Sequence, residues 1–124
     1  MPSERQLIRL AHRTMMTFAR AVDAKSMKEL HEYGSERWQD QMDVPKLDQT
    51  FKGFIDQDID LMLLKDLRPI FDGEPKINEE GSLWIEGHYA TRPSRVDFKQ
   101  GFSYEGIGWK LIALSVHLVP SDKP

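Results

Sequence analysis

The hydrophobic pattern of this chain changes its period once, near Pro69, and that change limits the folds open to it. In the first half, apolar residues recur at helical spacing and form one long stripe, which comprises Leu7, Ile8, Ala11, Met15, Phe18, Ala19 and Val22. In the second half, residues 83–90, 95–105 and 109–118 read as three long strands with period two. Helices followed by strands predict an α+β fold, in which N-terminal helices pack on a curved antiparallel sheet.

Cap signals set the expected ends of the helices. Ser3 followed by Gln6 predicts a capping box at the start of the first helix. Ser26 and Glu29 predict a second capping box on a short helix. We expect Gly34 to end that short helix in a left-handed conformation.

The composition indicates one domain without a nucleic-acid or membrane partner. The 124 residues show no linker and no repeat, so we expect a single domain over residues 1–124. Lys and Arg number 17 against 20 Asp and Glu, mixed along the chain, with a net charge of −3. A nucleic-acid binder would carry a basic stripe, and none is evident. No apolar run approaches the roughly 20 residues that a membrane span needs.

The same composition predicts no metal and no cofactor. The chain has no cysteine, which excludes disulfides, thiolate metal sites and cysteine nucleophiles. Its four histidines lack the spacing of a metal site. Asp56, Asp58 and Asp60 resemble the start of a calcium loop, but Leu61 stands where that loop needs glycine and Leu67 where it needs glutamate.

The compartment stays open. Residues 1–5 lack the apolar core of a signal peptide. A mature exported, periplasmic form would also lack a signal peptide, and a cysteine-free protein suits either redox environment.

Turn geometry predicts how the long strands pair. A turn at residues 91–94 sets Tyr89 opposite Val96, and the same register brings His88 to Asp97 as an opposite-charge or hydrogen-bonding pair. The remaining predicted pairs are Gly87 with Phe98, Ile85 with Gln100, and Glu86 with Lys99.

The pairing of the last strand is predicted from a tight turn at Gly106 and Ile107. This turn places Tyr104 opposite Trp109, and the register then runs on through the pairs Phe102 with Leu111, Gln100 with Ala113, and Phe98 with Ser115. A bulge at Gly101 would slip this register by one residue and exchange the faces of the strand.

The predicted registers gather a candidate pocket on the face that the helices cover. Its residues are Tyr89, Phe98, Gln100, Tyr104, Ser115 and His117. Gly87 and Ala113 are small and would leave space on a concave sheet, which is typical of a mostly apolar small-ligand site. The alternative is that helix side chains fill this space and that Gln100 bonds to backbone.

The opposite face of the sheet predicts a homodimer. The registers place Trp84, Ile112, Leu114 and Val116 there. An exposed apolar patch of this extent is typical of an interface, and two-fold association would bury it.

The chain resembles the nuclear transport factor 2-like superfamily. The resemblance is carried by the first-helix stripe, the break at residues 23–25 before a short helix, and the closing segment Gly108-Trp109-Lys110-Leu111-Ile112. Residues 93–96 and Tyr104-Glu105 are similar to small bacterial members of unassigned function, which are often exported. The resemblance implies a cone-shaped, cystatin-like fold with a pocket between helices and sheet, and frequent dimerisation through the sheet.

Three functions follow from these observations. The leading one is a non-catalytic domain that binds a small, largely apolar ligand. The second is a cofactor-free isomerase or lyase acting on a hydrophobic substrate, and the third is a structural or interaction module with a filled core. No catalytic residue is assigned, because the catalytic residues of the superfamily's enzymes do not map onto this chain.

Overall fold

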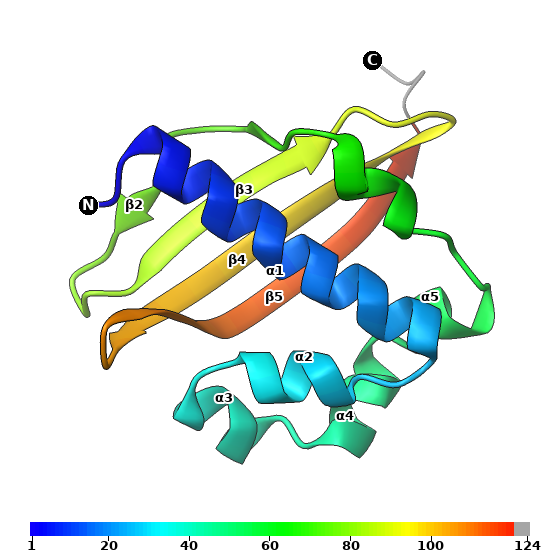
Figure 1. Cartoon of the computed structure of the whole chain (residues 1–124), viewed down its shortest axis with the longest axis horizontal. Helices are drawn as coiled ribbons and strands as arrows, with labels where there is room; N and C mark the ends of the chain where they lie inside the picture. The colour runs from blue at the N-terminus through cyan, green and yellow to red at the C-terminus, as the bar shows by residue number, and fades with distance from the viewer. Residues whose placement is uncertain (121–124) are drawn as a thin grey trace.

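A computed structural model describes residues 1–120 as helices packed on one face of an open antiparallel sheet (Figure 1). The helices are α1 (Glu4–Ala24), α2 (Lys28–Tyr33), α3 (Glu36–Gln41), α4 (Val44–Thr50), α5 (Lys52–Asp56) and the 3-10 helix η1 (Met62–Asp66). The strands are β1 (Ile70–Phe71), β2 (Lys76–Ile77), β3 (Leu83–Tyr89), β4 (Ser94–Glu105) and β5 (Gly108–Pro120). The predicted α+β class is confirmed. No helix within these residues is long and apolar enough to cross a membrane.

Helix α1 runs obliquely across the sheet and forms the centre of the core (Figure 1). Its predicted capping box is confirmed, since Ser3 Oγ accepts from the Gln6 amide and the Gln6 side chain accepts from the Ser3 amide. Every residue from Thr14 to Ala19 is buried, because the sheet covers one side of the helix and the shorter helices cover the other. The two buried threonines bond back to carbonyls one turn earlier, so their hydroxyls stay satisfied.

Helix α2 begins differently from the prediction. The N-cap is Met27, which is fully buried, and no side chain of the helix caps it. Its amide donates to Asp48 Oδ1 of α4 at 2.9 Å. The predicted box of Ser26 and Glu29 forms only in part, since Ser26 Oγ accepts from the Lys28 amide at 3.3 Å. The start of this helix therefore combines a local serine cap with a contact between two helices.

Gly34 ends α2 for another reason than the one predicted. Its backbone is extended, with φ −77° and ψ 176°, and not left-handed. The indole of Trp38 packs directly against it, and a Cβ at this position would lie 2.0 Å from Trp38 Cδ1. The glycine is needed for this close approach and not for its backbone freedom.

The sheet has the strand order β1-β3-β4-β5, with β2 also paired to β3. The predicted register of the two central strands is confirmed, including Tyr89 opposite Val96, His88 opposite Asp97 and Ile85 opposite Gln100. On the helix-facing side, Leu83, Ile85, Val96, Phe98 and Phe102 are all buried.

The predicted register of the last strand is wrong beyond Leu111, and the expected alternative, a one-residue slip at Gly101, is the register that occurs. Phe102 pairs with Leu111 as predicted, but Gly101 pairs with Ala113, so Ile112 is an extra residue in a β-bulge. From there Gln100 pairs with Leu114, Phe98 with Val116 and Asp97 with His117.

The bulge has a packing reason. On the outer face the ring of Trp84 lies over Gly101, where a Cβ would be 2.7 Å from the ring. On the inner face the bulge keeps both Leu111 and Val116 turned toward the helices, where they are buried. A regular strand would have turned one of the two outward.

Candidate functional site

The bulge separates the residues predicted to form one pocket. Tyr89, Phe98 and Gln100 lie on the helix-facing side and are 0, 4 and 0% exposed. Ser115 and His117 pair with Lys99 and Asp97 on the outer face and are exposed. Tyr104 is 60% exposed near the turn between β4 and β5, where its ring meets Trp109 edge-on at 5.2 Å.

Two of the three residues predicted at a dimer interface in β5, Leu114 and Val116, also change faces. They lie on the helix-facing side, opposite Gln100 and Phe98. Trp84 is on the outer face as expected, and Ile112 is the partly buried bulge residue. The outer face therefore loses most of the apolar patch from which a homodimer was predicted.

Gln100 bonds to backbone in the middle of the core. Its Nε2 donates to the Ala11 carbonyl of α1 at 3.1 Å. Its Oε1 is buried and has no hydrogen-bond partner within residues 1–120. The region around Gln100 is thus packed by α1, as the filled-core alternative required.

Tyr89 connects this core to the surface through His12. The Tyr89 hydroxyl and His12 Nδ1 are 2.7 Å apart, and His12 Nε2 lies 3.1 Å from the Lys65 carbonyl. A carbonyl can only accept, so in the neutral ring Nε2 carries the proton and Nδ1 accepts from the tyrosine. Burial raises the pKa of Tyr89 above its usual value of 10.0, which keeps that phenol a donor.

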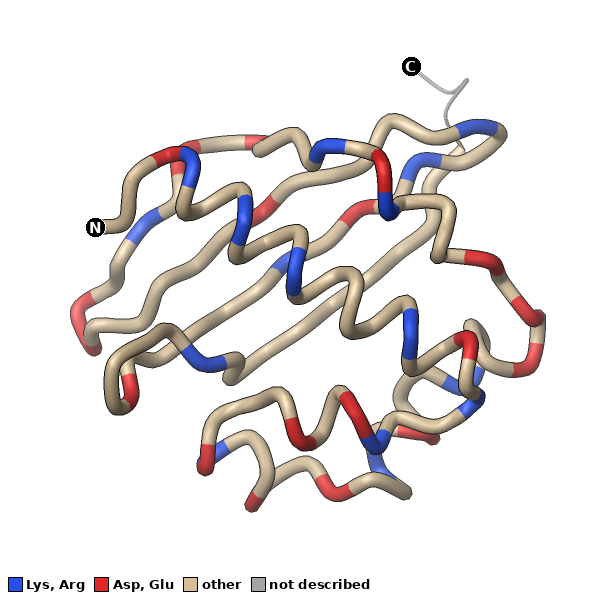
Figure 2. The backbone as a smooth tube through the Cα atoms, viewed as in Figure 1, with Lys and Arg blue, Asp and Glu red and all other residues tan. Residues whose placement is uncertain are grey.

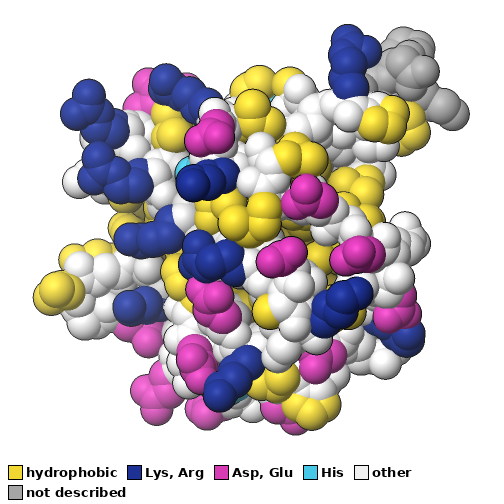
Figure 3. All heavy atoms as spheres, turned by 45° about the vertical axis from the view of Figure 1, so that its right-hand side comes forward, with side chains coloured by type: hydrophobic (Ala, Val, Ile, Leu, Met, Phe, Trp, Pro, Cys, Tyr) yellow, Lys and Arg dark blue, Asp and Glu magenta, His cyan; other side chains and the backbone are white. Residues whose placement is uncertain are grey.

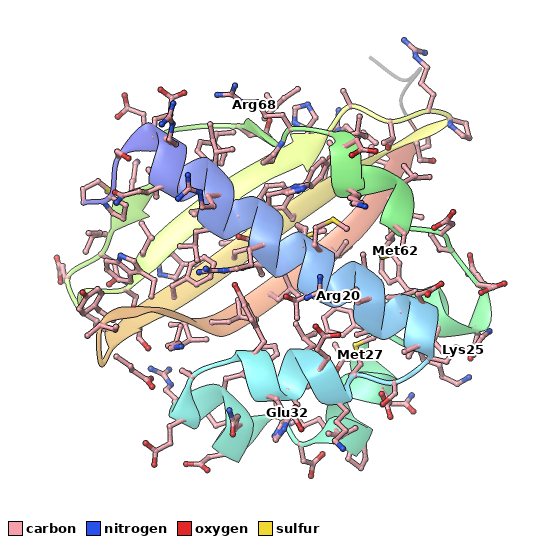
Figure 4. The ribbon with its side chains drawn as sticks, viewed as in Figure 1. Arg20, Lys25, Met27, Glu32, Met62 and Arg68 are labelled. Atoms are coloured by element: carbon pink, nitrogen blue, oxygen red, sulfur yellow. The ribbon has the colours of Figure 1, made fainter. Side chains whose placement is uncertain are left out.

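His12 also forms part of the wall of a surface groove. The groove lies between the N-terminal half of α1 and residues 67–69, has a volume of about 480 Å³, and is lined by Glu4, Arg5, Ile8, Arg9, His12, Leu67, Arg68 and Pro69. We call it the arginine groove. Figure 4 labels Arg68 on the segment that follows η1, beside the N-terminal half of α1.

The charge of the arginine groove is positive. Arg5, Arg9 and Arg68 are exposed residues, and none forms a salt bridge in the part of the chain that the structure describes. Glu4 is the only acid among its lining residues. Figure 2 shows basic positions repeating along α1, and Figure 3 shows Lys and Arg side chains gathered at the upper left of that view.

Sequence reasoning missed this surface although its signal was present. Arg5, Arg9 and Arg13 recur every four residues, which puts them on one side of a helix, opposite the buried Leu7 and Leu10. A search for consecutive basic residues does not reveal this stripe, because its members are four residues apart. Arg68 is distant in sequence, and only the path of the chain after η1 brings it to the groove.

A second hollow lies on the outer face of the sheet. It has a volume of about 290 Å³ and is lined by Asp72, Glu86, Gly87, Asp97, Phe98, Lys99, Ser115 and His117. Its charges are mostly paired within the protein: His88 bonds to Asp72 at 2.7 Å, and Arg95 bonds to Asp97 at 2.7 Å, which raises the pKa of Arg95. His88 and Asp97 are opposite each other as predicted, but they do not bond to each other: His88 bonds to Asp72, and Asp97 bonds to Arg95.

Among residues 1–120, no group of three or more His, Asp or Glu side chains is placed to hold a metal ion.

Comparison with protein-family models, curated proteins and solved structures finds no match to this chain.

Proposed function

We propose that the protein is a non-catalytic binding domain of nuclear transport factor 2-like type, which holds an anionic amphipathic small molecule in the arginine groove. The observation that carries this proposal is the convergence of Arg5, Arg9 and Arg68 on one groove without carboxylate partners in the described chain. Arginine presents several donors in a fixed fork that matches a carboxylate or phosphate group.

The groove also supplies a surface for the apolar part of such a ligand. Ile8 is partly buried, Leu67 is 40% exposed, and Pro69 is a buried residue of the same lining. A mostly apolar site with a few convergent polar groups is the usual form of a small-molecule site. The proposed ligand differs in two ways from the one expected from the sequence. It carries a negatively charged group, and it binds in the arginine groove and not between the helices and the sheet.

The hydrogen bonds of His12 argue against this residue as the general base of an isomerase or lyase. A general base needs an accessible lone pair, and His12 Nδ1 already accepts from Tyr89 while Nε2 donates to Lys65. Neither nitrogen is open to a substrate in the groove. We therefore rank catalysis below binding.

The second candidate is an interaction module with a filled core. It is favoured by the packing of Gln100, which is 0% exposed and bonded to α1. The two candidate functions can be distinguished by substituting the arginines of the groove, because only ligand binding in the groove depends on them.

A calorimetric comparison of decanoate with decanol, below micellar concentrations, tests the proposal. The two probes share a chain and differ in the charge of the head group. We expect decanoate to bind and decanol to bind much more weakly. A hydrogen bond between charged groups contributes about 1.5–3 kcal/mol, so Arg9→Gln or Arg68→Gln should each weaken decanoate by about tenfold or more.

Arg37→Gln is the matched control, because Arg37 is an exposed arginine on α3 without a salt bridge in the described chain. It should leave the affinity unchanged. Equal binding of the two probes, or an equal loss in the control, would contradict the proposal.

A further inference from the structure

The outer edge of β5 is open along most of its length. The strand order places β5 at the end of the sheet. One bond covers the start of this edge, from the Ser35 amide to the Leu111 carbonyl at 2.9 Å, where α3 approaches. For residues 112–120, no hydrogen bond from any described residue other than those of β4 reaches the backbone.

Between the bulge at Ile112 and Pro120 at its end, this edge lacks the devices that usually prevent strands from pairing. Natural edge strands carry charged side chains, proline or a bulge, or they are very short. Residues 113–119 read Ala-Leu-Ser-Val-His-Leu-Val, with no Asp, Glu, Lys, Arg or Pro, and the bulge lies before them at Ile112. The opposite edge is protected, because β1 and β2 have two residues each and Asp72, Glu74 and Pro75 lie between them.

Partly exposed apolar side chains follow the same edge. Leu118 is 40% exposed and Leu114 is partly buried, and both lie on the helix-facing side of β5. A further strand beside β5 would cover them and would also satisfy the open backbone groups. The partner is therefore an extended strand with an alternating, uncharged pattern.

We propose that this partner is a second copy of the chain, paired antiparallel through β5 about a two-fold axis at Val116. In this register Leu114 meets Leu118 of the other copy on the helix-facing side. On the outer side Ser115 meets His117 of the other copy, and Ala113 meets Val119. Apolar residues face apolar residues and polar residues face polar residues, so one sequence serves as both halves of the interface.

The pairing closes at two copies. Each copy offers one open edge within its described residues, and the dimer uses both, so the sheet does not extend into a fibre. This dimer differs from association through the outer face of the sheet, which the position of Leu114 and Val116 does not support.

A charge exchange at Ser115 and His117 tests both the interface and its register. Both side chains are exposed, so the substitutions leave the core intact. In S115K/H117K the proposed register sets lysines directly opposite each other, and like charges opposite each other destabilise strand pairs. In S115D/H117K the same register sets Asp opposite Lys, and the two variants differ only at residue 115.

Sedimentation equilibrium should find the wild-type protein dimeric. It should find the dissociation constant of S115K/H117K raised by about tenfold or more, and that of S115D/H117K near the wild-type value. Circular dichroism checks that both variants are folded. Two controls, Trp84→Lys on the outer face of β3 and Ile107→Lys at the exposed turn, should leave the dimer unchanged.

A wild-type protein that stays monomeric at millimolar concentration overturns the proposal. An S115K/H117K variant that dimerises like the wild type overturns it as well. Failure of S115D/H117K to restore the dimer overturns the register, and dissociation caused by Trp84→Lys assigns the interface to the outer face instead.

Discussion

The imidazole of His12 on α1 and the hydroxyl of Tyr89 on β3 are joined by a hydrogen bond of 2.7 Å across 77 residues of sequence. The bond fixes the helix to the sheet directly behind the arginine groove. Because Tyr89 is 0% exposed, the geometry of the groove depends on a phenol that solvent does not reach.

We predict that this buried phenol makes the protein sensitive to alkali. Burial raises the pKa of Tyr89 in the folded protein above the value of 10.0 that it has when unfolded. The folded state therefore holds this proton more tightly than the unfolded state does. The resulting stabilisation of the folded state is complete below about pH 10 and is lost as the pH rises above it. In that range Tyr89 should lower the free energy of unfolding by up to about 1.4 kcal/mol for each pH unit.

Urea unfolding between pH 8 and pH 11 measures this effect. Tyr89→Phe should cost about 1 kcal/mol at pH 8 through the lost hydrogen bond, and its stability should fall less steeply above pH 10. Tyr104→Phe is the control, because Tyr104 is 60% exposed, and its profile should follow the wild type. Parallel profiles for wild type and Tyr89→Phe would refute the prediction.

A second prediction concerns the buried amide of Gln100. Its Oε1 has no partner in the described chain, and an unsatisfied buried polar group costs about 1–3 kcal/mol. Gln100→Leu removes that group, and the Ala11 carbonyl that it leaves still faces the helical amide one turn later. The melting temperature should stay equal or rise.

Gln100→Glu keeps the shape of the side chain and adds a charge. We expect it to lower the free energy of unfolding by more than about 3 kcal/mol at neutral pH, because a carboxylate would be buried without a partner. If Gln100→Leu instead lowers the free energy of unfolding more than Gln100→Glu does, the prediction is wrong, and the amide stabilises the fold more than its single hydrogen bond indicates.

A third prediction compares two glycines. A Cβ on Gly34 would lie 2.0 Å from the ring of Trp38, so Gly34→Ala must displace a buried indole and should cost about 1–3 kcal/mol. Gly53 lies inside α5 with open space around it, so Gly53→Ala should stabilise the protein by about 0.5–1 kcal/mol. Thermal unfolding followed by circular dichroism compares them, and shifts of the same sign would contradict the prediction.

A fourth prediction concerns the contact between α2 and α4. Asp48 Oδ1 accepts from the amide of Met27, a residue that is fully buried. Asp48→Ala leaves that amide without its partner and should lower stability by about 1–3 kcal/mol. Asp48→Asn keeps the acceptor and should have a small effect. Urea denaturation distinguishes the two, and equal losses would show that the charge of Asp48 matters more than its hydrogen bond.

The sequence was informative wherever local rules govern the structure. The change of period before the strands and the capping box of Ser3 were both correct. The register of β3 and β4 was correct because turn geometry and the pairing of Glu86 with Lys99 pointed to one alignment. Each of these features depends on residues that are close together in the chain or directly opposite in a hairpin.

The errors share another physical origin. The start of α2 depends on Asp48, and the need for Gly34 depends on the ring of Trp38, so in both places the deciding group belongs to a neighbouring element. Arg68 reaches the arginine groove only through the path of the chain after η1. Composition and periodicity carry no information about such contacts.

The extra residue at Ile112 reverses the odd and even positions of β5. Before it, odd-numbered residues such as Leu111 face the helices, and after it even-numbered residues such as Val116 do so. A related protein without this residue would carry its core side chains at positions of opposite parity. An alignment that places the compensating gap elsewhere would therefore exchange interior and surface over several residues, and apparent conservation there would be misread.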